Sequence, residues 1–380
     1  MGGELEKSEN RTVAQAILAS KAYAIVRGST YFMLVVAAFV CCMGSITSDL
    51  GVLLGWLLAL GWYWVAVFVH EAGHAVAAAA CGWRIMVFVA GPFGYHIHNR
   101  EFAVIPRSKR SEFAGFVLPT PRSAAVWTRS RAAIISAAGP LASVILALVS
   151  GAVAITSRNA DLGGGFDLSL TAAGLSLMST ATALITLTPS RAGKRASDIQ
   201  QVTQSLRTDD AKWLKTRAIA RLYGLVKHQI RLRDLPTWML EESRIRTCDD
   251  NVLMRGHEAL EIAIEMDKQV VDAKLVREML CDFRERHGDD AWTGSSAAYL
   301  AAVWERDRRA ARASLWQGDI EEELRPFAFA AEAAIAALEG DGSAATLLLK
   351  HMRKAIRQKS AFSDCSFRDI EQQVLGLLPT

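Results

Sequence analysis

The sequence predicts a mainly α-helical protein in two parts, a polytopic membrane domain followed by a soluble all-α domain. With 51% hydrophobic residues and a positive mean hydropathy of +0.17, the chain is too apolar for an ordinary soluble protein. Its 22% charged residues exclude a chain that lies wholly in lipid. The apolar residues concentrate before Pro189 and the charged residues after it. We therefore expect a polar, amphipathic N-terminal segment over 1–29, a membrane-embedded domain over 30–202 and a soluble domain over 203–380.

Four stretches of the first half are apolar enough to enter a membrane. They are about Thr30–Ile46, Val52–Cys81, Ala132–Ile155 and Leu168–Leu187. A transmembrane helix needs roughly 20 residues, so the first stretch is marginal and the second is too long to stand upright.

Basic residues flank these stretches and predict their orientation. Lysine and arginine accumulate on the cytoplasmic side of membrane proteins. We expect an integral, multi-pass protein of a bacterial cell membrane with both termini in the cytoplasm. The net charge of +4 is modest and comes largely from these flanking residues, which favours the lipid bilayer as a partner and gives no sign of nucleic-acid binding. The residues are Lys7, Arg11, Lys21 and Arg27 before the first stretch, and Arg84, Arg100, Arg107, Lys109, Arg110, Arg122 and Arg129 after the second.

The second stretch contains the motif His70-Glu71-Ala72-Gly73-His74. Residues four apart lie one turn above each other on a helix, so both imidazoles can bind one metal ion from the same face. Glu71 then lies beside the open metal position, as the general base of a zinc hydrolase lies beside its activated water. Ionisable groups at membrane depth are costly and are usually functional. The motif therefore predicts an intramembrane zinc metalloprotease. A polar cluster that merely reaches the lipid headgroups explains neither the spacing nor the glutamate.

A hydrolytic zinc ion usually has three protein ligands, and Asp198 is the candidate for the third. With the orientation above, the second and fourth stretches both end on the cytoplasmic side, and Asp198 is the carboxylate that follows Pro189 there. The alternative is a helix N-cap, because Ser197 or Asp198 could start a helix through Ile199 and Val202. Spacing alone leaves both interpretations open.

Three motifs resemble the site-2 proteases, zinc metalloproteases that cut substrates within or beside the membrane. They are the HEAGH motif, Ala138-Gly139-Pro140-Leu141-Ala142-Ser143, and Leu187-Thr188-Pro189 followed by Ser197-Asp198. The resemblance spans roughly Val52–Val202. It implies that His70, His74 and Asp198 bind one Zn²⁺ per chain and that Glu71 activates a zinc-bound water. The implied substrates are membrane-anchored regulatory proteins or small hydrophobic peptides.

The chain also departs from the family pattern. Relatives often have asparagine where this chain has Ser143 and Thr186, and those asparagines are thought to orient the substrate or the transition state. A catalytically inactive membrane scaffold is therefore the alternative function. A zinc transporter fits less well, because it has no need of Glu71 as a base. We ascribe Gly73 to the general tolerance of glycine in membrane helices and not to close helix packing.

The connection after the second stretch predicts a short membrane-associated β segment. Val87–Val89, Tyr95–His98 and Phe113–Val117 read as strands, with a turn at Gly91-Pro92. In the resembling family such a segment can dip into the membrane and pair with an extended substrate. We expect His96 and His98 to form the polar face of a strand and not a metal site.

The soluble domain predicts helical hairpins of the tetratricopeptide type. A Glu-x-Asp pattern followed by paired small residues recurs at Asp267, Asp307 and Asp341, and the last two copies are 34 residues apart. Each aspartate should lie in a turn and cap the next helix. Such arrays expose concave surfaces, so we expect a protein partner, for example the cytoplasmic tail of a substrate. The alternative is a bundle with a structural or oligomerising role.

Overall fold

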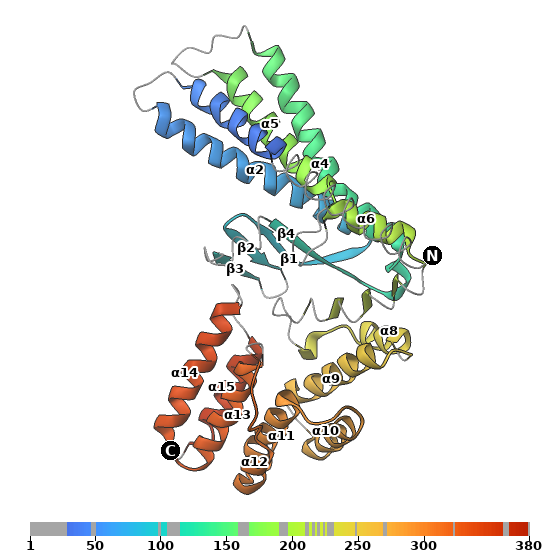
Figure 1. Ribbon diagram of the computed structural model, residues 1–380, viewed down its shortest axis with the longest axis vertical. Helices are drawn as coiled ribbons and strands as arrows, with labels where there is room; N and C mark the ends of the chain where they lie inside the picture. The colour runs from blue at the N-terminus through green and yellow to red at the C-terminus, as the bar shows by residue number, and fades with distance from the viewer. Residues whose placement is uncertain are drawn as a thin grey trace, which may run out of the picture. The chain divides into compact units, whose positions relative to one another are not determined.

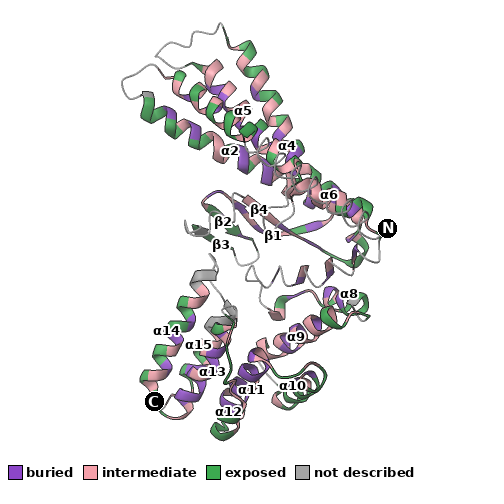
Figure 2. Ribbon diagram, in the orientation of Figure 1, coloured by how far each residue is buried: buried purple, intermediate pink, exposed green. Residues whose placement is uncertain are grey.

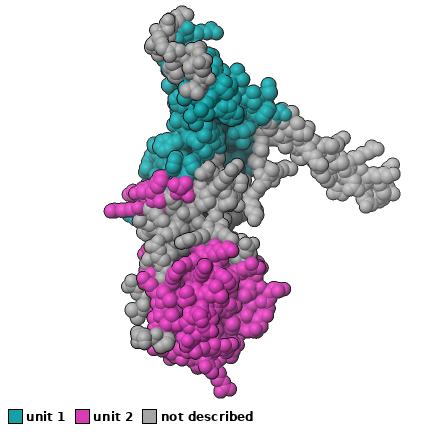
Figure 3. All heavy atoms as spheres, turned by 90° about the vertical axis from the view of Figure 1, so that its left-hand side faces the viewer, with its two compact units in different colours: residues 1–94, 107–121, 126–208 teal, residues 95–106, 122–125, 209–380 magenta. Residues whose placement is uncertain are grey.

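The computed structural model describes most of the chain after residue 28. The described residues are 29–46, 51–97, 100–104, 115–158, 167–189, 197–209, 213–214, 217–218, 221–222, 225, 232–247, 249–268, 272–321, 324–359 and 365–378. The amphipathic segment expected over 1–29 thus lies outside them except for residue 29. The chain forms two compact units (Figure 3), residues 1–94, 107–121 and 126–208, and residues 95–106, 122–125 and 209–380.

Three helices of the first unit are long and apolar enough to cross a membrane (Figure 1). They are α2 (Gly51–Ala80), α4 (Arg129–Thr156) and α5 (Leu168–Leu187). Helices satisfy every backbone donor and acceptor internally, which an apolar surrounding requires. These helices confirm three of the four predicted stretches. The first stretch forms a shorter apolar helix, Ser29–Gly44, in line with its marginal length.

Small residues bring these helices close together. A β-carbon at Gly73 of α2 would lie 2.6 Å from the carbonyl oxygen of Ala138 and 2.7 Å from the β-carbon of Ala142, both on α4. Our expectation for Gly73 was therefore wrong, because the glycine is needed for close packing. Large apolar side chains of α2 such as Leu53, Trp56 and Leu57 are exposed, as lipid contact requires. Figure 2 shows exposed residues at intervals along this helix.

The connection after α2 forms a four-stranded sheet in the order β3-β2-β1-β4. The strands are β1 (Trp83–Ala90), β2 (Phe93–His96), β3 (Glu101–Val104) and β4 (Gly115–Pro121). β1 and β4 are antiparallel, with Trp83 opposite Pro121 and Ala90 opposite Gly115. The predicted turn between the first two strands is present, and Gly91 has the positive φ of 60° that favours glycine.

The link between α2 and β1 is short and held in place. Only Cys81 and Gly82 separate the two elements, and Gly82 has a φ of 79°. The guanidinium of Arg131 donates to the carbonyl of Cys81 at 3.3 Å. The indole of Trp83 donates to the carbonyl of Val126 at 3.0 Å, which fixes the first residue of the sheet.

His96 does not lie on a polar face as expected. Its side chain is fully buried, whereas its neighbours Phe93, Tyr95 and Ile97 are exposed. Alternation along β2 places the aromatic residues on the outer face and the histidine on the inner one. His98 lies outside the described residues.

The second unit is helical. Its α-helices are α8 (Thr237–Thr247), α9 (Asn251–Asp267), α10 (Ala273–His287), α11 (Ala291–Val303), α12 (Arg308–Ser314), α13 (Arg325–Leu338), α14 (Gly342–Lys359) and α15 (Cys365–Leu375). Alanines of α11 and α13 form much of its core, together with Leu349 and Met352 of α14. Small side chains let these helices approach each other closely.

Two of the three predicted caps are present. Asp307 accepts from the Ala310 amide and Asp341 from the Ala344 amide, both at 2.9 Å. Asp267 is not a cap, because it is the last residue of α9 and accepts from the Arg233 amide at 3.1 Å. Asp272 caps α10 instead.

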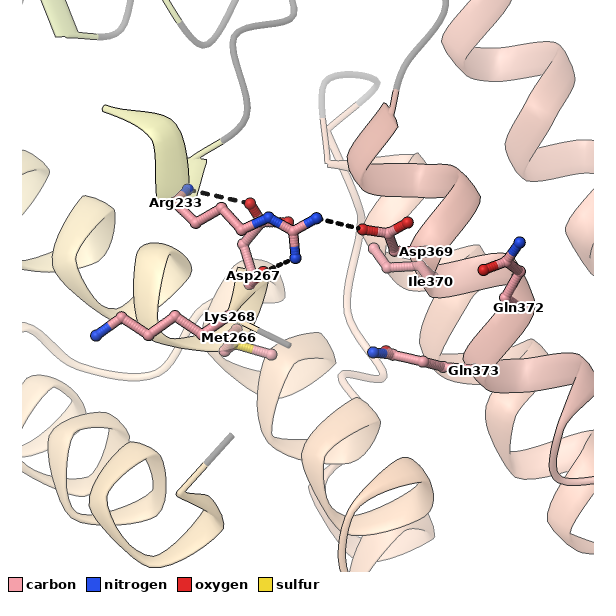
Figure 4. Close-up of a pocket in the computed structure, with 8 residues that line it drawn as sticks. All are labelled: Arg233, Met266, Asp267, Lys268, Asp369, Ile370, Gln372 and Gln373. Atoms are coloured by element: carbon pink, nitrogen blue, oxygen red, sulfur yellow. Dashed lines mark hydrogen bonds and ion pairs between the residues drawn. The ribbon is translucent and has the colours of Figure 1, made fainter. Parts of the chain in front are cut away.

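A polar cavity of about 320 Å³ lies within this unit (Figure 4). The guanidinium of Arg233 crosses it and donates to the Asp267 carbonyl at 3.3 Å and to the Asp369 carboxylate at 3.1 Å. One side chain therefore connects the end of α9 with α15. The cavity is further lined by Met266, Lys268, Ile370, Gln372 and Gln373.

Candidate metal centre

The two histidines of the HEAGH motif and Asp198 converge on one point. They lie on α2 and on α6 (Asp198–Arg207), 128 and 124 positions apart in the sequence. The Nε2 atoms of His70 and His74 are 3.3 Å apart. The Oδ2 atom of Asp198 lies 3.1 Å from the first and 3.6 Å from the second. Within the described residues, this is the one group of three or more histidine, cysteine or carboxylate ligands that could hold a metal ion.

The spacing of the three ligand atoms fits a tetrahedral zinc site. Zinc binds imidazole nitrogen and carboxylate oxygen at about 2.0–2.1 Å, so neighbouring ligand atoms of a tetrahedron lie about 3.3 Å apart. The three observed separations, 3.1, 3.3 and 3.6 Å, lie around this value. Two histidines and one carboxylate are also a donor set that catalytic zinc uses.

Hydrogen bonding supports a cation at this point. The Nδ1 atom of His74 lies 2.6 Å from the carbonyl oxygen of Ile135. A carbonyl only accepts, so Nδ1 carries the proton and the Nε2 atom of the neutral ring presents a lone pair. That lone pair faces the carboxylate of Asp198. Two electron-rich atoms at this distance need a metal ion or an added proton between them.

Asp198 is placed by the start of α6. Ser197 is the N-cap residue, and its backbone amide donates a hydrogen bond to the side-chain oxygen of Gln200 at 2.9 Å. Asp198 is thus the first residue of the helix, and its carboxylate is directed to the histidines. Burial raises the pKa of Asp198, but its interactions with His70 and His74 lower the pKa by more, so the net value lies below the ordinary one. The carboxylate is charged at neutral pH, as a metal ligand must be.

Glu71 is buried beside the ligands and lies against the start of β4. A β-carbon added at Gly115 would lie 2.5 Å from its Oε1 atom. The absence of a side chain at Gly115 therefore gives the carboxylate its space. Gly115, the first residue of the edge strand β4, therefore lies beside Glu71, the candidate base.

The two departures from the family pattern lie in different surroundings. The hydroxyl of Ser143 is 3.0 Å from the Nδ1 atom of His70. The hydroxyl of Thr186 instead donates to the carbonyls of Thr182 and Ala183 in its own helix, both at 3.1 Å. Only the first residue contacts the cluster.

Sequence reasoning named the three candidate ligands that the structure brings together and missed the residues that orient them. Ile135 and Gly115 carried no signal, because one acts through a backbone carbonyl and the other through the lack of a side chain. Ser143 was noted only as a replacement for asparagine. A search of α4 for residues spaced by four, as 135, 139 and 143 are, would have pointed to the face that meets the motif.

Comparison with known proteins gives one finding. The model of peptidase family M50 matches residues 58–371, which is most of the chain. No characterised protein and no solved structure matches the sequence. The matched region includes the HEAGH motif, Asp198 and most of the second unit.

Proposed function

Because the chain belongs to peptidase family M50, the site-2 protease family, we propose that it is an intramembrane zinc metalloendopeptidase. The single observation that carries the proposal is the convergence of two histidine nitrogens and one carboxylate oxygen with the separations of a tetrahedral zinc site. The three apolar helices support an integral membrane protein. From the distribution of basic residues we propose that both termini lie in the cytoplasm, and we propose a bacterial cell membrane as the location.

The residues have the following roles. His70, His74 and Asp198 would hold one zinc ion, which when bound polarises a water molecule and the scissile carbonyl. Glu71 accepts a proton from the attacking water and later donates it to the leaving amine. Burial of Glu71 limits competition from bulk water for that proton.

The substrate proposed is a membrane-anchored regulatory protein or a small hydrophobic peptide. A peptide bond inside a helix is shielded, so the substrate must be presented as an extended strand. In the described part of the sheet β4 lies at one edge, and its first residue lies beside Glu71. Strand addition to β4 would present an extended peptide beside the base.

The second unit is proposed to be an array of helical hairpins that binds a protein partner, such as the cytoplasmic tail of the substrate. The caps at Asp307 and Asp341 and the buried Ala311 and Ala345 support the hairpin pattern. A chain truncated after Leu206 tests the role. Unchanged cleavage of a native substrate would rule out recruitment and favour a structural role.

Zinc content tests the catalytic proposal. We expect about one zinc per chain, by elemental mass spectrometry, in protein purified in detergent without chelators, and a clear loss in Asp198→Ala. Glu71→Gln should keep its zinc and lose hydrolysis of a library of labelled single-span peptides with glycine or proline within the span. Continued hydrolysis by that variant would remove Glu71 from the mechanism.

An inactive membrane scaffold is the second candidate. The observation that favours it is the presence of Ser143 and Thr186 where relatives often have asparagine. Wild-type protein that binds no zinc after gentle purification would support the scaffold.

A further inference from the structure

Both histidines of the motif are held through their Nδ1 atoms by one face of α4. Ile135, Gly139 and Ser143 follow each other at intervals of four residues, so they lie above one another on that face. The Ile135 carbonyl fixes the proton of His74 on Nδ1, because a carbonyl can only accept. The partner of His70 is different, since the Ser143 hydroxyl can either donate or accept.

The hydroxyl of Ser143 differs in its partner from two other buried hydroxyls of the apolar helices, those of Ser150 and Ser179. Ser150 of the same helix donates to the carbonyl of Leu146 at 2.6 Å, and Ser179 donates to the carbonyl of Leu175 at 2.9 Å. That bond, one turn back along the helix, is the usual one for serine in an apolar helix. The hydroxyl of Ser143 instead lies 3.0 Å from a ring nitrogen on α2.

This hydrogen bond is shielded from water. Ser143 is 0% exposed and His70 is 4% exposed. Water cannot replace the hydroxyl at a buried ring nitrogen, so loss of the hydroxyl would leave the Nδ1 atom without a partner. The orientation of the His70 ring therefore depends on Ser143.

We infer that Ser143 is a positioning residue that presents His70 as an Nε2 ligand. Its oxygen accepts the Nδ1 proton, which leaves the Nε2 lone pair directed at Asp198 and the Nε2 atom of His74, 3.1 and 3.3 Å away. Partners of this kind fix the tautomer and the ring orientation of a metal-binding histidine. The inference rests on the proposed function, because it assigns a role toward the same zinc site.

Zinc affinity of Ser143→Ala, measured by competition with a chelator of known affinity, tests this role. Changing the outer partner of a ligating histidine typically weakens metal binding by about 10- to 100-fold, and we expect a loss of this size. Ser150→Ala is the matched control, since it removes a buried hydroxyl from the same helix but not from the site. It should bind zinc as the wild type does.

Two further readouts separate positioning from a fold defect. With Co²⁺ in place of zinc, the visible absorption bands should shift in Ser143→Ala and not in Ser150→Ala, because the bands report on the ligand nitrogens. The metal-free forms of the two variants should unfold at the same temperature in detergent. Equal zinc affinity in Ser143→Ala and the wild type would overturn the inference and leave the proposed function intact. A lower unfolding temperature of metal-free Ser143→Ala that accounts for its loss of zinc affinity would do the same. A wild type that binds neither metal would overturn the proposed function and the inference with it.

Discussion

Gly139 of α4 faces the Nε2 atom of His74 with no space between them for a side chain. A β-carbon at position 139 would lie well inside van der Waals contact with this atom and with both neighbouring ring carbons. The backbone of α4 thus forms one wall of the site. Any side chain at position 139 would overlap the His74 ring, so the Ala138–Ser143 segment needs a glycine there.

Gly139→Ala should lose zinc. The added methyl group displaces the imidazole of His74 from the point where the three ligands meet, and a two-ligand site binds zinc weakly. We expect well below one zinc per chain by elemental mass spectrometry. Gly61→Ala on α2 is the control, because a β-carbon there meets nothing within 4 Å. One zinc per chain in Gly139→Ala would show that the His74 ring can move without loss of zinc affinity.

Gly115→Ala should separate zinc binding from cleavage. The three atoms nearest to its β-carbon all belong to Glu71, so the substitution would act first on that carboxylate. Misplacement of a catalytic group by about 1 Å can cost roughly 100-fold in rate, so we expect a loss of 10- to 100-fold in peptide hydrolysis with zinc retained. Loss of zinc in this variant would contradict our view that the missing side chain at Gly115 makes room for Glu71 alone.

Gly73→Ala should destabilise the packing of α2 on α4. The β-carbon would press on the Ala138 carbonyl and the Ala142 methyl group, and overpacking of this kind costs about 1–3 kcal/mol. The midpoint of thermal unfolding in detergent measures the effect, again with Gly61→Ala as control. Equal midpoints for the two variants would mean that the helices separate without penalty.

Arg233→Ala should loosen α15. The variant removes two hydrogen bonds through which this side chain connects the last residue of α9 with Asp369 of α15, each worth about 0.5–1.5 kcal/mol. Limited proteolysis of the full chain should cut near α15 faster than in the wild type. Arg246→Ala, which breaks an ion pair one turn along α8, is the control and should have little effect. Equal cutting rates in both variants would argue against the connecting role.

The first turn of α14 should become less stable in acid, because protonation of Asp341 weakens its hydrogen bonds to that turn. The Ala344 amide and then the Ser343 hydroxyl donate to this carboxylate and hold its pKa below the ordinary value. A depressed pKa contributes stability above the unfolded pKa, and this contribution is lost as the pH falls through the folded pKa, so the window lies below about pH 4. Hydrogen exchange at the first turn of α14, corrected for its intrinsic pH dependence, should rise in this window. Asp341→Asn keeps an acceptor but does not titrate, and a rise of equal size in it would exclude Asp341 as the cause.

Sequence patterns predicted the features of this protein that depend on local periodicity. Apolar runs predicted three helices that are long and apolar enough to cross a membrane, and the spacing within HEAGH placed two histidines on one helix face. The identity of Asp198 as a neighbour of His70 required the resemblance to site-2 proteases, because spacing alone allowed a cap. Gly73, His96 and Asp267 were misjudged, since each depends on what another element places against it: the backbone of α4, the inner side of the sheet and the Arg233 amide. The local pattern of residues in a sequence cannot predict such contacts between distant elements.

The two-residue link between α2 and β1 has a mechanical consequence. Cys81 and Gly82 leave no slack, and Arg131 and Trp83 fasten the link at both ends. The short link couples the position of the sheet to that of α2. Glu71 lies only about 14 Å from the end of this helix, at 1.5 Å per residue. We therefore expect displacement of β1 to move the end of the helix that carries both histidines. If the proposed strand addition takes place, binding of the peptide to the sheet and the position of Glu71 on α2 would be coupled through Cys81 and Gly82.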